Sequence, residues 1–139
     1  MKKNIFLYVS IVAPIIIFSM FTGQATAAAK QVQLDILYMN HGPMRPTIGK
    51  IKNLVANYKG SLQASWYDFD QPEGKAFMKK QKLTGHIPLL LVLDGQSDFS
   101  IDGREVLLQG FPTGASPFKQ VEGNWSLDDL QSILDQKTR

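Results

Sequence analysis

Beyond position 30 the chain contains short apolar runs, and between the first two of them apolar residues recur at helical spacing. Three β-rich or fully apolar runs predict strands, at residues 32–39, 62–69 and 89–93. The third run is apolar at every position, which indicates a central strand of a sheet. A helix between the first two strands is predicted from residues three or four positions apart: Ile48, Ile51, Leu54, Val55 and Tyr58. It ends at Lys59-Gly60, because glycine often follows the last helical residue.

The second half of the chain predicts a shorter helix and a hairpin. Residues 72–81 begin with Pro72, a favourable first helical residue, and predict the short helix. Two turn signals follow the central strand, at Asp94-Gly95 and Asp102-Gly103. We interpret them as a β-hairpin with an enlarged tip, whose second strand includes residues 105–108.

The chain ends with a predicted loop and a predicted helix. Residues 112–124 are rich in glycine, proline and small polar residues, which is typical of a loop. Ser126 is a favourable N-cap, and Asp129 follows it at the third helical position, so a helix is predicted to begin there. The whole order is strand, helix, parallel strand, helix, hairpin and covering helix. It describes a single mixed α/β sandwich.

The N-terminal residues predict a segment that lies outside this domain. Lys2 and Lys3 precede an uncharged, mostly apolar run at residues 5–21, and small residues precede a cleavage position after Ala27. This is the pattern of a secretory signal peptide at residues 1–27. The alternative is an uncleaved membrane anchor through residues 5–21, which are at the lower length limit for a transmembrane helix. Both interpretations predict an extracytoplasmic domain at residues 30–139, periplasmic or secreted.

Charge and cysteine content exclude several classes of function. The formal net charge of the chain is +3, and it falls to +1 without Lys2 and Lys3. A nearly neutral domain has no electrostatic attraction to nucleic acid. It would meet a membrane only through an uncleaved N-terminal segment. The chain has no cysteine, which excludes a disulfide framework.

Several short motifs, in this order, resemble those of the thioredoxin-like superfamily. His41-Gly42-Pro43-Met44 lies between the first predicted strand and the first helix, where thioredoxins have Cys-Gly-Pro-Cys. Asp35 on the first strand matches their buried acid, and residues 68–72 resemble the turn after their next strand. Gly85-His86-Ile87-Pro88 resembles the segment that carries their cis-proline, and Gly110 matches a glycine after their hairpin.

The resemblance implies a thioredoxin fold over residues 31–137, with a three-layer sandwich, a mixed four-stranded sheet and about three helices. It also implies that Pro88 is cis and lies beside the motif. Thiol–disulfide exchange is excluded, because a thiolate is the nucleophile of that reaction and this chain has no cysteine. Pro46 is a further departure from the family. Since residues before proline avoid helical angles, Arg45 is expected to lie outside the helix.

The only two histidines of the chain are both expected near the motif, which raises the possibility of a metal site. Cu(I) favours thioether ligands, and imidazole binds copper in either oxidation state. Copper bound by His41, Met44 and His86 is therefore one hypothesis. In the alternative interpretation, the histidines are polar residues of a rim, Met44 is a packing residue, and the protein has no cofactor.

The sequence carries no established catalytic motif. It has no Ser-His-Asp arrangement, phosphate-binding loop or paired carboxylates. Asp35, as a possible buried acid, would act with His41 in acid–base catalysis. The alternative is that Asp35 is a hydrogen-bonded structural residue. We therefore assign no catalytic residue.

The preferred functional hypothesis is a redox-inactive domain that binds another protein, as an assembly factor or chaperone. In redox-active thioredoxins the cis-proline edge pairs with extended peptide, and that groove does not require cysteines. The expected partner is a protein or an extended peptide of the cell envelope. The alternative is copper or other metal handling. The predicted binding residues are those of the motif and of the proline edge: His41, Gly42, Pro43, Met44, His86, Ile87 and Pro88.

Overall fold

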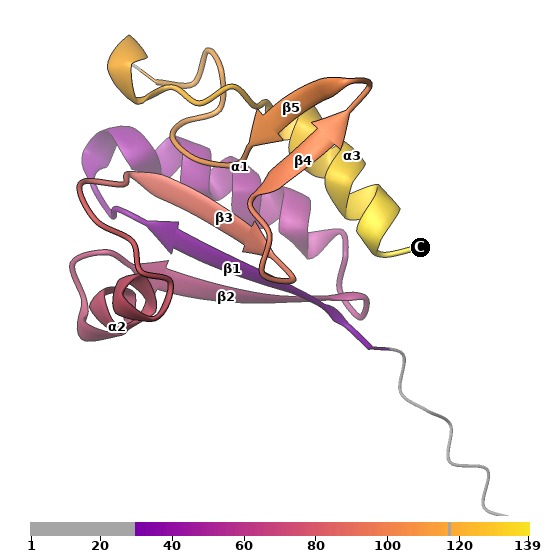
Figure 1. Cartoon of the computed structure of the whole chain (residues 1–139), viewed down its shortest axis with the longest axis horizontal. Helices are drawn as coiled ribbons and strands as arrows, with labels where there is room; N and C mark the ends of the chain where they lie inside the picture. The colour runs from indigo at the N-terminus through magenta and orange to yellow at the C-terminus, as the bar shows by residue number, and fades with distance from the viewer. Residues whose placement is uncertain (1–29, 117) are drawn as a thin grey trace, which may run out of the picture.

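The centre of the protein is a mixed three-stranded sheet (Figure 1). Its strands lie in the order β2-β1-β3. The middle strand, β1 (Val32–Tyr38), is parallel to β2 (Leu62–Asp68) and antiparallel to β3 (Leu89–Leu93). The sequence predicted all three strands, with small differences only at the ends of the first two.

The sheet belongs to a computed structural model that describes residues 30–116 and 118–139. The predicted signal peptide or anchor, at residues 1–27, lies outside the described residues. Within the described part of the chain, no helix combines the length and the apolar character that crossing a membrane requires.

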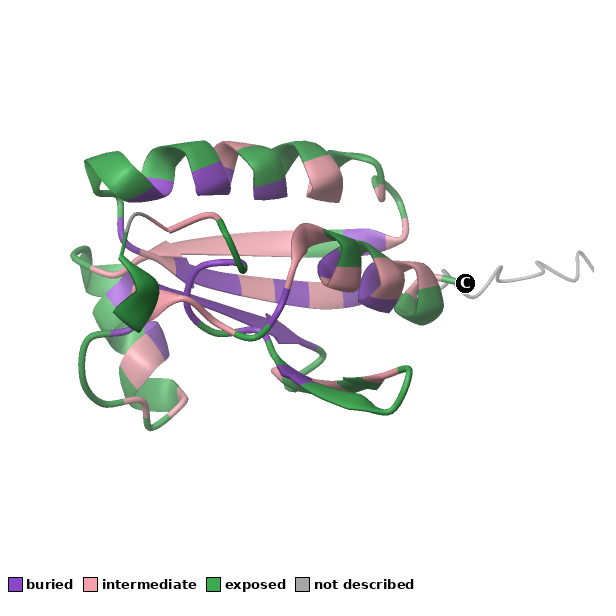
Figure 2. Ribbon diagram, turned by 90° about the horizontal axis from the view of Figure 1, so that it is seen from above, coloured by how far each residue is buried: buried purple, intermediate pink, exposed green. Residues whose placement is uncertain are grey.

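Helices cover both faces of the sheet, and Figure 2 shows α1 and α2 on opposite sides of it. α1 (Arg45–Ala56) connects β1 to β2 and shares one apolar cluster with α3 (Leu127–Lys137). α2 (Pro72–Lys80) belongs to the other cluster. Alternation along β1 explains this division, because Leu34 belongs to the first cluster and Leu37 to the second. The mixed α/β class with three helices is thus confirmed.

The hairpin after β3 forms its own two-stranded sheet, so the expected four-stranded sheet is wrong. β4 (Asp98–Ile101) pairs only with β5 (Arg104–Leu107). The chain just after β5 meets β3 at a single bridge, between Leu90 and Gln109. The sequence predicted a hairpin between the central strand and residues 105–108, whereas β5 pairs with β4 instead.

Asn124 covers the outer edge of β5, which faces away from β4. Its side chain accepts a hydrogen bond from the Leu107 N–H and donates one to the Glu105 carbonyl, each at 2.9 Å. These are main-chain groups on the outer edge of β5, and each group needs one partner. The Asn124 amide therefore takes the place of a neighbouring strand.

The turns around β4 are tighter than the enlarged tip that was expected. Asp94-Gly95 forms a turn closed by hydrogen bonds between Leu93 and Gln96, at 2.7 and 3.0 Å. Asp102-Gly103 is the two-residue tip between β4 and β5. All four turn residues have positive φ, which aspartate tolerates and glycine adopts freely. A strand, β4, thus occupies much of the expected tip.

The start of α1 also differs from the prediction. A 3-10 turn, η1 (Gly42–Met44), leads directly into α1. Arg45 is the first residue of α1, with φ −53° and ψ −45°, although it was expected outside the helix. Pro46 is compatible with this position, because the N–H that proline lacks has no partner in the first turn of a helix.

The predicted start of the last helix is confirmed. The Ser126 hydroxyl accepts from the Asp129 N–H at 3.1 Å, and the Asp129 carboxylate accepts from the Ser126 N–H at 2.7 Å. This reciprocal pair is a capping box. It fixes where α3 begins.

Candidate functional site

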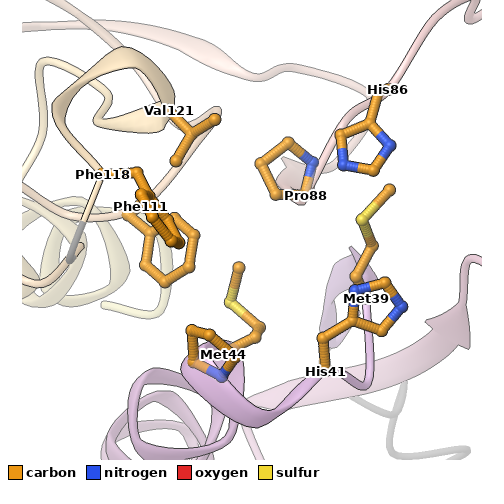
Figure 3. Close-up of a pocket in the computed structure, with 9 residues that line it drawn as sticks. Met39, His41, Met44, His86, Pro88, Phe111, Phe118 and Val121 are labelled. Carbon is orange, nitrogen blue, oxygen red and sulfur yellow. The ribbon is translucent and has the colours of Figure 1, made fainter.

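The predicted motif forms the connection from β1 to α1, and it lies beside a pocket (Figure 3). The Met44 and Arg45 N–H groups donate to the His41 carbonyl, at 3.0 and 3.3 Å. Pro43 suits this turn because its fixed φ is close to the helical value. Met44 is only 2% exposed. The local sequence therefore orients His41, Pro43 and Met44 toward one pocket.

Pro88 faces this motif from the segment that precedes β3 (Figure 3). Its carbonyl accepts from the Met39 N–H at 3.0 Å, which extends the pairing of β1 and β3 to the pocket. The bond between Ile87 and Pro88 is trans, and no cis peptide bond occurs within the described residues. The cis-proline that the resemblance implied is therefore wrong. The trans form is the favoured one, by about 0.5–1 kcal/mol before proline.

The pocket between the motif and Pro88 has a volume of about 170 Å³. This volume is below the range of about 300–1,000 Å³ that is typical of small-molecule sites. The pocket is therefore sized for a single side chain. Its lining is apolar apart from two imidazoles: Met39, His41, Pro43, Met44, His86, Pro88, Phe111, Phe118 and Val121.

Two predicted binding residues do not line the pocket. Ile87 is 7% exposed and belongs to the apolar cluster of Leu37 and Phe77, on the α2 side of the sheet. Gly42 is exposed, and no atom lies within 4 Å of the position that a Cβ would take there. The motif therefore indicated the right region, but only part of it faces the pocket.

The two histidines lie at the exposed rim of the pocket. His41 Nε2 is 3.2 Å from Asp70 Oδ2, and these side chains are 58% and 57% exposed. Because water screens such a pair, it contributes little to stability. His86 has an edge contact with Phe69, with 6.0 Å between ring centroids. Both imidazoles are thus accessible to a ligand.

Asp35 takes no part in the pocket. It is half-buried, and its Oδ1 accepts from the Gln33 amide at 2.9 Å and from the Tyr67 hydroxyl at 3.4 Å. The carboxylate that meets His41 is that of Asp70. The buried acid and the pairing of Asp35 with His41 are therefore wrong. The hydrogen bonds of Asp35 fit the structural interpretation instead.

The proposed metal ligands do line one pocket. His41, Met44 and His86 are joined there by Met39, whose thioether points toward His86 in Figure 3. In the part of the chain that the structure describes, no three His, Cys, Asp or Glu side chains gather into a possible metal site. A metal bound here would therefore use thioether sulfur, a ligand that suits Cu(I).

The opposite side of the pocket consists of residues that the motifs did not indicate. Phe111, Phe118 and Val121 lie across from Met44 and Pro88 (Figure 3). Phe118 and Val121 belong to the segment predicted as a loop, which includes a short 3-10 turn, η2 (Lys119–Val121), and Phe111 immediately precedes that segment. We call this side the loop wall (Phe111, Phe118, Val121). We call the other side the motif wall (His41, Pro43, Met44, His86, Pro88).

Contacts between distant residues hold the loop wall in place. The Phe111 N–H donates to the Val121 carbonyl at 2.8 Å. Trp125 is fully buried, and its indole N–H lies 3.2 Å from both the Gln109 and the Gly110 carbonyl oxygens. Gly110 has φ +77°, and a Cβ there would lie 2.6 Å from the Val121 carbonyl oxygen. Only glycine fits this position without displacing the loop wall.

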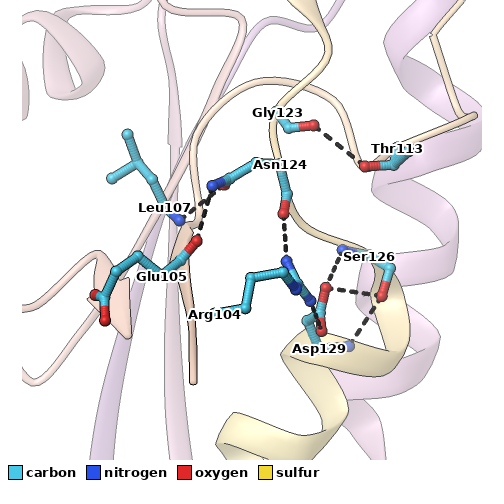
Figure 4. A network of polar contacts seen from close by, with 8 residues as sticks. All are labelled: Arg104, Glu105, Leu107, Thr113, Gly123, Asn124, Ser126 and Asp129. Carbon is cyan, nitrogen blue, oxygen red and sulfur yellow. Dashed lines mark hydrogen bonds and ion pairs between the residues drawn. The ribbon is translucent and has the colours of Figure 1, made fainter. Parts of the chain in front are cut away.

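A polar network connects the segment that follows the loop wall to β5 and α3 (Figure 4). Arg104 donates to the Asn124 carbonyl at 2.7 Å and to the Asp129 carboxylate at 2.6 Å. Burial acts to raise the pKa of Asp129. The hydrogen bonds from Arg104 and Ser126, together with the Arg104 charge, outweigh burial and hold this pKa below its ordinary value. Asp129 is therefore an ionised anchor for both segments.

A second pocket, of about 340 Å³, adjoins the first one. The two share His86, Pro88 and Val121, and we call them together the groove. In residues 30–116 and 118–139, two large apolar side chains are exposed: Leu107, 42% exposed, and Phe118, 58% exposed. Leu107 lines the second pocket and Phe118 the first. A phenylalanine among small and polar loop residues was the sequence signal for this site.

Comparison with known proteins gives no family to which the chain can be assigned. No family description matches the sequence, and no curated protein is significantly similar to it.

Proposed function

We propose that this protein is a thioredoxin-like, redox-inactive domain whose groove binds an extended segment of another protein. The order of elements from β1 to α3 and the approach of Met44 to Pro88 support the thioredoxin-like assignment. Because the chain has no cysteine, binding is what remains of the family's activity at this surface. The predicted segment at residues 1–27 supports a role outside the cytoplasm, as an assembly factor or chaperone.

The observation that carries this proposal is the position of Leu107 and Phe118. Both are large apolar side chains exposed to water, and both border the groove. Complete burial of a fully exposed apolar side chain is favourable by about 1.5–3 kcal/mol, and these two, 42% and 58% exposed, would gain roughly half of it from a partner. Exposed apolar side chains that gather at a concave surface are typical of a binding site.

The two halves of the groove fit different parts of a peptide. The first pocket has thioethers of Met39 and Met44 in its lining, and methionine adapts to apolar partners of different shape. The second pocket is larger and more polar, since Gln109 and Glu122 line it. We therefore expect a bulky apolar side chain of the peptide in the first pocket and its main chain along the second.

Selection from a library of displayed peptides tests this proposal. The bait is the full-chain protein, purified in the form that accumulates in expressing cells. We expect selected peptides to share one bulky apolar residue. We expect Phe118→Ala to weaken their binding about tenfold, which corresponds to about 1.4 kcal/mol. Lys119→Ala is the matched control, because Lys119 is exposed next to Phe118 but lines neither pocket.

Two outcomes would contradict the peptide-binding function. One is that no peptide is enriched although the protein is folded. The other is that selected peptides bind the Phe118→Ala and Lys119→Ala variants equally well, which would locate binding elsewhere.

Copper handling is a second candidate function, supported by the ligands that meet in the first pocket. Two accessible imidazoles, of His41 and His86, and two thioethers, of Met39 and Met44, line the same cavity. This set of nitrogen and soft sulfur donors suits Cu(I) better than Zn²⁺ or Mg²⁺. The Met39 thioether was not part of the predicted ligand set, and it strengthens this hypothesis.

A competition titration with a coloured Cu(I) chelator measures this second function. We expect a dissociation constant for Cu(I) below about 1 μM. His86→Ala and Met39→Leu should each weaken the affinity for Cu(I) at least about tenfold. Asp70→Asn is the control, because Asp70 contacts His41 but does not line the pocket. Binding weaker than micromolar, or equal in all variants, would eliminate copper.

A further inference from the structure

The two edges of the main sheet differ in the hydrogen bonding of their outward main-chain groups. Beyond β3, the Leu91 N–H donates to the Leu108 carbonyl at 2.9 Å, and the Gly110 N–H donates to the Leu89 carbonyl at 2.8 Å. Beyond β2 there is no further strand among the described residues (Figure 1). The β2 edge is therefore the open edge of the sheet.

Two hydrogen bonds show which main-chain groups of β2 face outward. The Val32 N–H donates to the Ser61 carbonyl at 2.9 Å, and the Phe69 N–H donates to the Tyr38 carbonyl at 2.8 Å. In a parallel ladder, alternate residues of a strand bond to the same neighbour. Odd-numbered residues of β2 thus bond to β1, and the N–H and C=O groups of Ala64 and Trp66 point away from it.

β2 lacks the features that usually protect an exposed edge. It contains no proline and no lysine, and its pairing with β1 runs without a bulge from Leu62 to Asp68. Edge strands that remain unpaired in solution are commonly interrupted by such features. A long, regular, nearly uncharged edge favours pairing with another strand.

We propose that β2 pairs antiparallel with β2 of a second copy of this chain, about a two-fold axis at Ser65. In this register Ala64 lies opposite the partner's Trp66, and Trp66 lies opposite the partner's Ala64. The outward N–H and C=O groups of both residues then bond to the partner's main chain. The two three-stranded sheets join into one continuous sheet. This proposal does not depend on the function of the groove.

The side chains suit this register. On the α1 face, the large Trp66 meets the small Ala64 of the partner subunit. Trp66 is held in place by an edge contact with Tyr38, with 5.9 Å between ring centroids, and by Lys52 Nζ, 5.2 Å from its ring centroid. An ordered ring loses little side-chain entropy when a partner covers it.

The other face of β2 is also compatible with self-pairing. There Ser65 meets the partner's Ser65, and Gln63 meets the partner's Tyr67. None of these residues is charged, so no like charges lie directly opposite each other, an arrangement that would be destabilising. In this register Asp68, the one charged residue of β2, lies opposite the partner's Leu62, so the strand pair contains no like-charge contact.

A disulfide test is possible because the natural chain has no cysteine. In Ser65→Cys, the two copies of residue 65 face each other with Cα atoms about 4.5 Å apart, which is within the disulfide range. The control is Gln63→Cys, on the same face. Its two copies would be about 14 Å apart, given about 3.4 Å per residue along a strand. Mild oxidation of the full-chain variants should cross-link Ser65→Cys into a dimer and leave Gln63→Cys monomeric.

Sedimentation of the unmodified protein provides the second measurement. At concentrations on the order of 100 μM we expect the mass of a dimer, since an interface of one strand pair is of modest affinity. Ala64→Pro removes an outward N–H and leaves the β1 ladder intact, so this variant should be a folded monomer. The proposal is overturned if the unmodified protein is monomeric, or if both cysteine variants cross-link equally.

Discussion

The two walls of the groove are built in different ways. The motif wall combines a local turn, closed between His41 and Met44, with Pro88, which the central sheet holds through the hydrogen bond from the Met39 N–H to the Pro88 carbonyl. The loop wall instead depends on contacts within the C-terminal region, such as those of Trp125 with Gln109 and Gly110. One side of the groove therefore belongs to the central sheet and its first turn, whereas the other side forms only when the C-terminal region is folded.

This difference implies that the loop wall can be displaced without disturbing the motif wall. Phe118 and Val121 lie on a segment fixed mainly by main-chain partners and by one buried tryptophan. Met44, in contrast, belongs to the main apolar cluster. The variants below exploit this contrast, from the largest expected effect to the smallest.

Trp125→Ala should have the largest effect. Removal of a fully buried indole leaves a cavity and two carbonyls without a donor, and such substitutions cost about 3–5 kcal/mol. The free energy of unfolding in urea measures the loss. Trp125→Phe keeps most of the side-chain volume but not the N–H. Its free energy of unfolding should therefore lie between those of the unmodified protein and of Trp125→Ala. A loss below about 1 kcal/mol for Trp125→Ala would contradict the assigned anchoring role.

Gly110→Ala tests how well the backbone next to the loop wall tolerates a side chain. Its φ of +77° and the contact of the new Cβ with the Val121 carbonyl oxygen should together cost about 2–3 kcal/mol. Gly114→Ala has a similar φ of +76° but no atom within 4 Å, so it should cost only about 1 kcal/mol.

Gly42→Ala is the counterpart on the motif side. No atom lies within 4 Å of its Cβ position, so the change in unfolding free energy should stay within about 0.5 kcal/mol. Equal values for Gly110→Ala and Gly42→Ala, measured by urea unfolding, would show that the two walls are equally tolerant and would remove the contrast.

Asn124→Ala should have a smaller effect than Gly110→Ala, because the main-chain partners of Asn124 are near the surface. The Leu107 N–H and the Glu105 carbonyl would exchange the amide for water, at a cost of about 1 kcal/mol. Hydrogen exchange of the Leu107 amide should become faster, while exchange of the Met44 amide should stay unchanged. Unchanged exchange at Leu107 would mean that the amide does not protect the edge of β5.

The smallest effect concerns pH. The pKa of Asp129 is lowered in the folded protein, so its ionised form stabilises the fold above the unfolded pKa of about 3.9. This contribution to the free energy of unfolding is lost as the pH falls from about 3.9 through the lowered pKa of Asp129 in the folded protein. Urea unfolding at several pH values between about 2 and 5 measures it. Asp129→Asn should be less stable than the unmodified protein at neutral pH, and its free energy of unfolding should fall less steeply with decreasing pH. An equally steep fall in both proteins would assign the acid sensitivity to other carboxylates.

The sequence predicted those elements whose signals are local. Ser126 with Asp129 indicated the start of α3, and the apolar run of β3 indicated its full length. Asp102-Gly103 indicated a turn for a similar reason, since positive φ is a property of these residues themselves. Each of these signals requires no knowledge of distant parts of the chain.

The errors arose where distant residues compete for the same groups. The expected four-stranded sheet failed because β5 pairs along its whole length with β4 and not with β3. Of the two interpretations of Asp35, the possible buried acid failed because Gln33 and Tyr67 provide polar partners at a half-buried position. Phe118 was part of a predicted loop, and only the folded structure brings it opposite Met44.

The floor of the first pocket contains sulfur that has no thiol chemistry but can still react. Met39 and Met44 are 3% and 2% exposed, and their thioethers line the cavity. Addition of one oxygen atom by peroxide converts a thioether into a polar, chiral sulfoxide. The pocket would then repel the apolar side chains that it otherwise suits, and it would lose its soft donors. A domain without cysteine would thus remain sensitive to any oxidant that reaches this pocket, and methionine sulfoxide reductases are the enzymes that reverse this change.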